Sequence, residues 1–275
     1  MKQILIPYDF SENTESVLYY GLGLAKELHA NIILLHVMPY PIVTPESGLP
    51  AFSYKDLQTD SLKELQAVAD KIKTNEPAIE SITCYSDMGD VTESIVTYCK
   101  KHPIEFVVMG INQHNTKLMK VLMGSNAVET AHKTTCTVII VPPGTPYKTP
   151  KNIAFASNHD QTGRDPALQK ARSISTLFHA DFQVLHVVPE DHHFAPAEVV
   201  MDNYFEHKTE KQEHKLFIIT EKKVSEGLLG MLSNKLIDMI VVEPKEHGIF
   251  YKLFHESVSK ELAFSSPVPV VLIHA

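Results

Sequence analysis

Residues 29–39 read HANIILLHVMP and residues 179–189 read HADFQVLHVVP, so one stretch of sequence occurs twice at an offset of 150. A short run of Ile, Leu and Val with a proline at its end is typical of a buried β-strand. Six residues return at the same places: His29, Ala30, Leu35, His36, Val37 and Pro39, as His179, Ala180, Leu185, His186, Val187 and Pro189. The repeated strand indicates that the chain is two copies of one unit.

The ends of each copy match as well. KQILIP at 2–7 corresponds to KNIAFA at 151–156, EFVVM at 105–109 to DMIVV at 238–242, and TVIIV at 137–141 to PVVLI at 269–273. A chain of 275 residues suits two domains of about 140 residues. Four prolines and a glycine in PPGTPYKTP predict a short stiff connection. We therefore expect a first domain at 1–143, a linker at 144–150 and a second domain at 151–275.

Short apolar runs alternate with longer stretches of helical period, which is typical of parallel strands joined by helical crossovers. The predicted fold class is α/β, with two tandem doubly wound, five-stranded parallel sheets of Rossmann-like type. In the first copy the pattern predicts strands near 3–8, 31–38, 79–85, 104–109 and 136–141, and helices near 12–28, 54–73, 91–101 and 124–133. In the second it predicts strands near 152–157, 181–188, 214–220, 237–242 and 268–273.

Composition excludes several classes of protein. The net charge of −8, without a basic stripe in either half, disfavours nucleic-acid binding. No apolar run approaches the roughly 20 residues that span a bilayer, and the first residues lack a signal-peptide pattern, so we expect a cytoplasmic protein that does not bind membranes. Cys84, Cys99 and Cys136 are too few and too scattered for a disulfide framework, and we expect reduced thiols in or near the core.

Doubly wound sheets bind ligands at the carboxyl ends of their strands, where the strand order reverses. In the first copy this places a site in the loops after Tyr8, Val37 and Met109. The first strand ends in Pro7-Tyr8-Asp9-Phe10-Ser11, and the fourth ends in Val108-Met109-Gly110 and leads through a polar loop to Gly124-Ser125. With these residues the chain resembles the universal stress protein family in its tandem form, over nearly its whole length.

The resemblance implies an adenine nucleotide alpha hydrolase-like fold and a site for ATP or a related adenine nucleotide. Nucleotide-binding members carry an Asp after strand one and a loop of Gly, two residues, Gly, nine residues, Gly and Ser or Thr. Carried over, the site comprises Pro7, Tyr8, Asp9, Val37, Met109, Gly110, Gln113, Gly124, Ser125 and Asn126. Gln113 stands where the family has its middle glycine, and ten residues instead of nine separate it from Gly124. Together, a side chain where the loop should have none and a register change of one residue are expected to leave the pocket narrowed or aimed differently.

Structural roles compete with the binding roles. Asp9 and Ser11 suit the cap of the following helix. Gly110 suits a turn. His36 and His186 lie inside a strand pattern and are expected to be packed structural residues.

The second copy replaces the family's three glycines with Glu243, Glu246 and Glu256, and the counterpart of Asp9 falls at or next to Asn158. Carboxylates repel a phosphate chain by roughly 1 kcal/mol per close pair in water. We therefore expect a degenerate site that does not bind ATP in the family's manner. Ten of the fifteen histidines also lie in this half, and His159, His192, His193 and His247 with Asp160, Glu243 and Glu246 form a less favoured alternative, a divalent metal site.

No catalytic motif is found, and His114 and Lys117 could contact a phosphate without supplying a dedicated base. We expect a non-enzymatic stress-response protein that senses an adenine nucleotide in its first domain and acts through partners. Two alternatives stay open: an interaction protein that binds no nucleotide, and a weak ATP hydrolase. TVIIV and PVVLI are expected to pair the two domains within the chain, and a homodimer is a further possibility.

Overall fold

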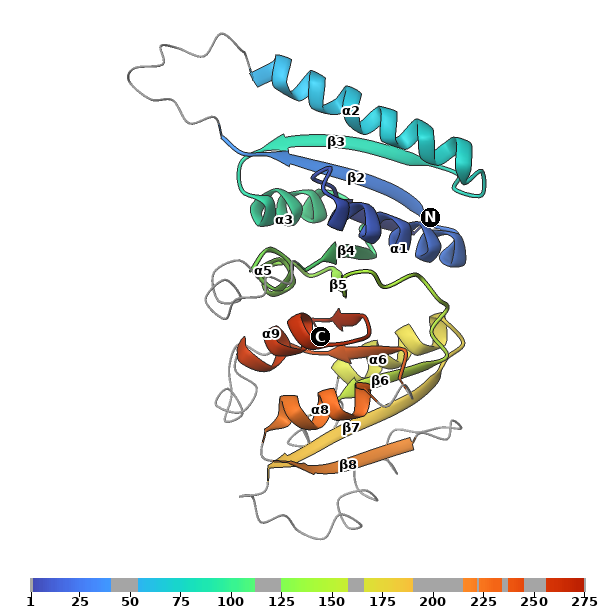
Figure 1. The fold of residues 1–275 in the computed structure, drawn as a ribbon, viewed down its shortest axis with the longest axis vertical. Coiled ribbons are helices and arrows are strands. Elements are labelled where there is room, and N and C mark those ends of the chain that lie inside the picture. The colour runs from blue at the N-terminus through green and yellow to red at the C-terminus, as the bar shows by residue number, and fades with distance from the viewer. Residues whose placement is uncertain are drawn as a thin grey trace, which may run out of the picture. The chain divides into compact units, whose positions relative to one another are not determined.

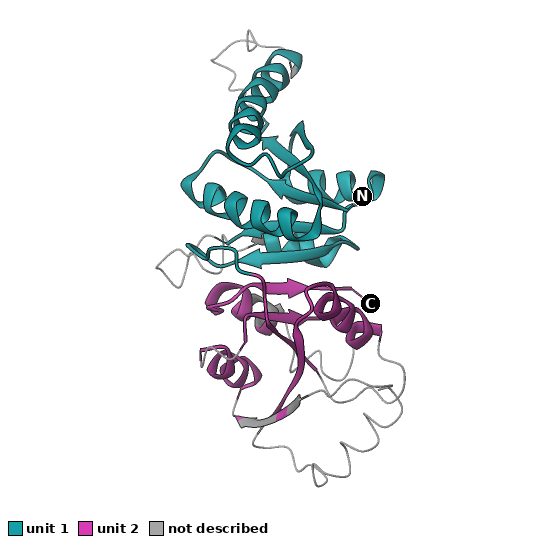
Figure 2. Ribbon diagram, turned by 90° about the vertical axis from the view of Figure 1, so that its right-hand side faces the viewer, with its two compact units in different colours: residues 1–148 teal, residues 149–275 magenta. Residues whose placement is uncertain are grey.

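A computed structural model describes residues 2–40, 54–111, 125–157, 166–189, 215–221, 223–233, 237–244 and 256–274. The chain divides into two compact units, residues 1–148 and 149–275, which Figure 2 draws in teal and magenta. Each unit is an α/β domain with a parallel sheet, as the sequence pattern predicts.

The first unit alternates strands and helices along the chain (Figure 1). Its elements are β1 (Gln3–Pro7), α1 (Glu12–Leu28), β2 (Asn31–Met38), α2 (Tyr54–Asn75), β3 (Ile82–Met88), α3 (Val91–Lys101), β4 (Phe106–Gly110), α5 (Ser125–Lys133) and β5 (Thr137–Val141). The strands lie in the order β3-β2-β1-β4-β5, and every pair is parallel. The order therefore reverses between β1 and β4, which fixes the place of a ligand site.

Helices cover both faces of this sheet. Ile4, Leu5 and Ile6 of β1 are all completely buried, so successive side chains are covered on opposite faces of the strand. The Lys26 ammonium lies 2.9 Å from a Glu76 carboxylate oxygen and joins the ends of α1 and α2, whereas Lys133 joins α5 to α3. Right-handed crossovers require this grouping of helices on the two faces.

The second unit repeats the arrangement. Its elements are β6 (Asn152–Ala156), α6 (Pro166–Leu177), β7 (Asp181–Pro189), β8 (Lys215–Glu221), α8 (Val224–Ser233), β9 (Met239–Val242), α9 (Glu256–Ser265) and β10 (Val270–Leu272). The parallel order β8-β7-β6-β9-β10 matches that of the first unit.

The repeated His-Ala pair ends the first helix of each unit. His29 and His179 have φ of 48° and 52°, in the left-handed region that histidine enters more readily than most residues. The Ala30 and Ala180 amides then donate to carbonyls five residues back, at 2.9 and 3.0 Å, as in a Schellman cap. Both histidines are therefore helix-capping residues, for a reason that lies in the backbone.

The repeated strand histidines also share one role. His36 Nδ1 lies 2.7 Å from the carbonyl oxygen of Tyr8, and His186 Nδ1 lies 3.0 Å from that of Ser157. A carbonyl only accepts, so Nδ1 carries the proton in both rings. Each histidine thus ties the second strand to the loop after the first strand. The matching bonds also align Tyr8 with Ser157, which makes Asn158 the sequence counterpart of Asp9.

The segment after β5 is anchored to the first unit. A Cβ at Gly23 would lie 2.5 Å from Cβ, Cγ and Cδ1 of Tyr147, so the Tyr147 side chain packs directly on the backbone of α1. The Tyr147 and Tyr20 rings meet edge to face at 5.2 Å. The first unit consequently extends to Lys148, and most of the segment expected as a linker belongs to it.

Two further findings concern membranes and thiols. No helix within the described ranges is long and apolar enough to cross a membrane. Cys84, Cys99 and Cys136 form no disulfide bond, and Cys136 is buried while the other two are partly exposed.

Candidate functional site

A cavity of about 160 Å³ lies at the carboxyl ends of β1, β2 and β4, where the strand order of the first unit reverses. Its described lining is Pro7, Tyr8, Asp9, Asn13, Thr14, Leu35, Val37, Val91, Met109, Gly110, Ile111, Asn126 and Ala127. The structure thus brings together seven of the predicted site residues: Pro7, Tyr8, Asp9, Val37, Met109, Gly110 and Asn126. Gln113 and Gly124 lie outside the described residues, and Ser125 begins α5.

The Asp9 carboxylate is held by the first turn of α1. Its Oδ1 accepts hydrogen bonds from the Ser11 amide at 3.0 Å and from the Thr14 hydroxyl at 2.7 Å. Burial raises the pKa of Asp9, but the hydrogen bonds from Ser11 and Thr14 outweigh it and lower the pKa below its usual value. Asp9 is therefore ionised at neutral pH and can only accept hydrogen bonds from a ligand.

Ser11 is the N-cap of α1, because its side chain accepts from the Thr14 amide at 3.3 Å and its backbone is extended. The predicted capping role therefore falls on Ser11, and Asp9 supports the cap without replacing it. Asp9 still lines the cavity, so capping and ligand binding are compatible at this residue.

Phe10, which lies between Asp9 and Ser11, has an unusual backbone conformation. Its φ of 62° lies in the left-handed region, which costs a residue with a Cβ roughly 1–2 kcal/mol. The Phe10 ring contacts the Tyr8 ring at 5.1 Å and the His36 ring at 4.9 Å, both edge to face. These contacts and the bond from His36 to the Tyr8 carbonyl oppose the strain. The turn that carries Asp9 is thus fixed by the ring contacts of Phe10 and by the hydrogen bond from His36 to the Tyr8 carbonyl.

Gly110 is required by packing. An added Cβ would lie 2.6 Å from Cγ2 of Val17 and 3.0 Å from Nδ2 of Asn13. The first turns of α1 therefore pack directly on the last residue of β4. This close approach explains the glycine without reference to a phosphate or to a turn conformation.

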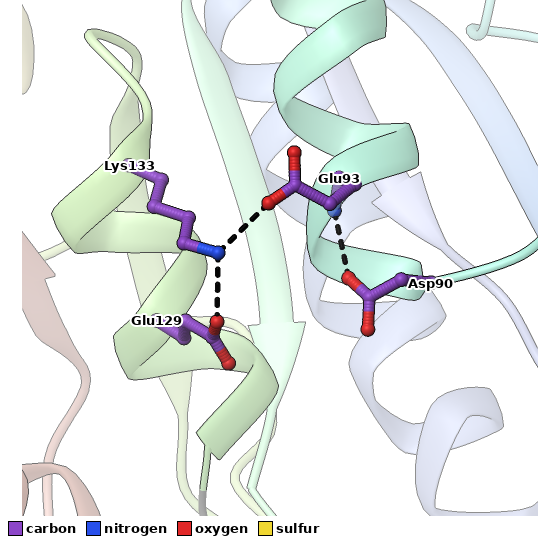
Figure 3. Close-up of polar contacts among 4 residues, drawn as sticks. All are labelled: Asp90, Glu93, Glu129 and Lys133. Atoms are coloured by element: carbon purple, nitrogen blue, oxygen red, sulfur yellow. Dashed lines mark hydrogen bonds and ion pairs between the residues drawn. The ribbon is translucent and has the colours of Figure 1, made fainter.

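Two helices begin at the cavity, α3 with Val91 and α5 with Ser125. The Asp90 side chain caps α3 by accepting from the Glu93 amide at 2.9 Å. Lys133 of α5 contacts Glu93 of α3 at 2.8 Å, which joins the two helices, and it also contacts Glu129 of its own helix at 2.9 Å (Figure 3). Asp90 already places a carboxylate at the N-terminus of α3, whereas the first amides of α5 have no acceptor within their own helix and favour negative charge, so the α5 end of the cavity suits an anion.

Six lining residues were not predicted from the sequence: Asn13, Thr14, Leu35, Val91, Ile111 and Ala127. Asn13 and Thr14 belong to the first turn of α1, which faces Gly110 only after the helix has packed on β4. The spacing of Asp9 and Thr14 across an N-cap serine is the one local signal that indicates a contact between them.

In the second unit the structure describes Glu243, a half-buried residue that follows β9 at the position of Gly110. Val17, which packs on Gly110, has Ala167 as its counterpart at the offset of 150, and Ala167 is fully buried. Compared with the first unit, the second unit therefore has a smaller residue on the helix, Ala167, and a larger residue after the strand, Glu243.

Most residues of the alternative metal site lie outside the described residues: His159, Asp160, His192, His193, Glu246 and His247. Asn158 lies outside them as well. Among the residues that the structure does describe, no group of three or more His, Cys, Asp or Glu side chains is placed to hold a metal ion. Glu256 is described as the first residue of α9.

Comparison with known proteins decides the family. The sequence model of the universal stress protein family matches residues 1–142, about half of the chain. The chain belongs to the universal stress protein family. It is similar to Universal stress protein MJ0531 of Methanocaldococcus jannaschii, with 30% identity over 143 residues that cover 51% of this chain and 81% of that protein. It is also similar to Universal stress protein YxiE of Bacillus subtilis, with 25% identity over 146 residues, 50% of this chain and 97% of that protein.

A solved structure matches both units. The crystal structure of a universal stress protein from Archaeoglobus fulgidus DSM 4304 has a TM-score of 0.71 and 20% identity, and the match covers 98% of this chain and 95% of that chain. At this identity the likeness establishes the fold, which is the tandem form of the family's α/β domain.

Proposed function

We propose that the first unit binds an adenine nucleotide, and that the protein acts in the stress response through this binding and through partners. The observation that carries the proposal is the Asp9 cavity: a cleft at the sheet's switch point whose polar groups suit opposite ends of a nucleotide. Membership of the universal stress protein family supports the stress-response part of the proposal.

The nucleoside end fits the side of the cavity that Asp9 occupies. Val37, Met109 and Ile111 give apolar surface for a flat base, and the ionised Asp9 accepts from a hydroxyl or an amine. A phosphate would meet repulsion there, because both groups are negative. The same chemistry directs the phosphates toward the N-terminus of α5, where Asn126 and Ala127 line the cavity.

Volume supports this orientation. The cavity of about 160 Å³ is smaller than the roughly 300–1,000 Å³ of pockets that enclose a drug-sized ligand. It therefore suits the nucleoside part of the ligand. The phosphates would extend out of the described lining, past the N-terminus of α5.

The described lining favours binding over turnover. Its titratable groups are the Tyr8 phenol and the Asp9 carboxyl. Burial and the negative charges of Glu15 and Asp9 raise the pKa of Tyr8, so it stays protonated, and the lowered pKa of Asp9 makes it a weak base. A hydrolase needs a group that activates water, and neither side chain is suited to that task at neutral pH.

Titration calorimetry of the full chain with ATP and with adenosine tests the proposal. Asp9→Asn removes the charge and keeps the side-chain shape, and we expect affinity to fall about tenfold or more, because a hydrogen bond to a charged group contributes about 1.5–3 kcal/mol. Glu12→Gln is the matched control: it makes the same change on the first turn of α1, at an exposed residue that does not line the cavity.

Two results separate the proposal from its alternatives. If the unmodified chain binds neither ATP nor adenosine, the proposed function is rejected in favour of an interaction protein. Phosphate release that persists in highly purified protein and disappears in Asp9→Asn would favour the weak hydrolase.

A further inference from the structure

The Asp9 carboxylate is held by the residues that begin α1. Oδ1 accepts from the Thr14 hydroxyl at 2.7 Å and from the Ser11 amide at 3.0 Å. Both of these donors share the same carboxylate oxygen. Asp9 lines the cavity together with Thr14, whereas Ser11 does not. The Thr14 hydroxyl thus holds one oxygen of a carboxylate that lines the cavity.

The hydroxyl groups of Ser11 and Thr14 donate their hydrogen bonds in one direction, toward Asp9. Thr14 has a single hydroxyl proton, and its oxygen lies 2.7 Å from Asp9 Oδ1 and 3.0 Å from the Ser11 carbonyl. An ionised carboxylate is the stronger acceptor and the shorter contact, so it takes this proton. Ser11 Oγ lies 3.3 Å from Thr14 Oγ1 and already accepts from the Thr14 amide, so its own proton is available to Thr14. The chain of donors therefore runs from Ser11 through Thr14 to Asp9.

We propose that Thr14 is a positioning residue for ligand binding: its hydroxyl fixes the Asp9 carboxylate so that Oδ2 faces the ligand and accepts from a hydroxyl or an amine. The inference rests on the proposed function and extends it, because it names the residue that makes Asp9 selective. A carboxylate held by Oδ1 cannot rotate to present both oxygens. It also keeps its charge, which excludes a phosphate from this end of the cavity.

Thr14→Val tests the role, because valine has nearly the shape of threonine and no hydroxyl. We expect the affinity for adenosine to fall about 5- to 10-fold, a part of the full value of a charged hydrogen bond. The affinity for ATP should fall by the same factor, since the change acts at the nucleoside end. Thr14→Ser keeps the donor and should retain affinity close to that of the unmodified chain. Unchanged adenosine affinity in Thr14→Val, or a loss confined to ATP, would overturn the proposal.

A second measurement needs no ligand. The pKa of the Asp9 carboxyl, followed by NMR in the full chain labelled with ¹³C-aspartate, should rise in Thr14→Val and stay low in Thr14→Ser. Other titratable groups near this turn are Tyr8, His36 on β2, and Glu12, Glu15 and Tyr19 on α1, and both variants keep all of them. An Asp9 pKa that is the same in both variants would overturn the positioning role. If the unmodified chain binds no adenosine, the proposed function fails, while this titration still decides whether Thr14 holds the carboxylate.

Discussion

Replacing Gly110 by alanine tests whether this family-pattern glycine serves packing. The new Cβ would lie 2.6 Å from Val17 Cγ2, whereas carbon atoms prefer a separation of about 3.5–4.0 Å. Val17 is 2% exposed and lies on α1, so it has no free space into which it can turn. The helix or the end of β4 must therefore shift by about 1 Å.

Overpacking of this kind destabilises a core by about 1–3 kcal/mol, and we expect Gly110→Ala to lower the free energy of unfolding by that amount. The φ of Gly110 lies outside the left-handed region, so the added methyl group brings steric and not conformational strain. Because Asn13 and Thr14 are in the first turn of the displaced helix, the affinity for adenosine should fall as well.

Urea unfolding followed by far-UV circular dichroism provides the measurement, since the chain has no tryptophan. Gly230→Ala is the matched control: Gly230 is an exposed residue of α8, a Cβ there meets nothing within 4 Å, and we expect a gain of about 0.5–1 kcal/mol. Val17→Ala removes the atom that clashes, so the double variant should be more stable than the sum of the single effects by about 0.5–3 kcal/mol. A neutral Gly110→Ala with no such coupling would refute the packing explanation.

Three further results are expected. The lowered pKa of Asp9 stabilises the native state above the unfolded-state pKa of about 3.9. This stability is lost as the pH falls through the lower native pKa. Urea midpoints from pH 6 to pH 3 should therefore fall more steeply in the unmodified chain than in Asp9→Asn. Parallel curves would contradict this account. Lys133→Met removes contacts to Glu93 and Glu129 that are largely exposed, so the urea midpoint should change only slightly. The difference should vanish in 1 M salt. A large, salt-independent loss of stability would argue for a role beyond surface charge. Tyr147→Ala removes the ring that packs on Gly23 and Tyr20, and we expect a loss of about 1–3 kcal/mol and faster proteolysis between residues 142 and 148. Unchanged proteolysis would mean that Tyr147 does not anchor this segment.

Periodicity predicted the fold because short buried strands such as β4 and β5 alternate along the chain with longer helical segments. The bounds of α1, β2 and α3 agree with the predicted 12–28, 31–38 and 91–101. β3 begins at Ile82, three residues later than predicted, because Ile79 belongs to a turn in which its amide donates to the Glu76 carbonyl. An isoleucine that is buried in a turn has the same composition signal as one in a strand.

The site was predicted in part. Residues at the ends of β1, β2 and β4 could be placed from topology alone, since the carboxyl ends of parallel strands meet at the switch point. Asn13 and Thr14 could not, because their approach depends on how closely α1 packs on Gly110. The repeated His36 and His186 were predicted to be structural, and their matching bonds to Tyr8 and Ser157 give the physical reason.

The most direct test of the central claim is a crystal structure of the full chain with a non-hydrolysable ATP analogue. We predict one nucleotide per chain in the first unit, with the nucleoside beside Val37 and Met109, a hydroxyl or amine on Asp9 Oδ2, and the phosphates toward the N-terminus of α5. A nucleotide bound in the second unit beside Glu243, with the cavity at Asp9 empty, would contradict the account.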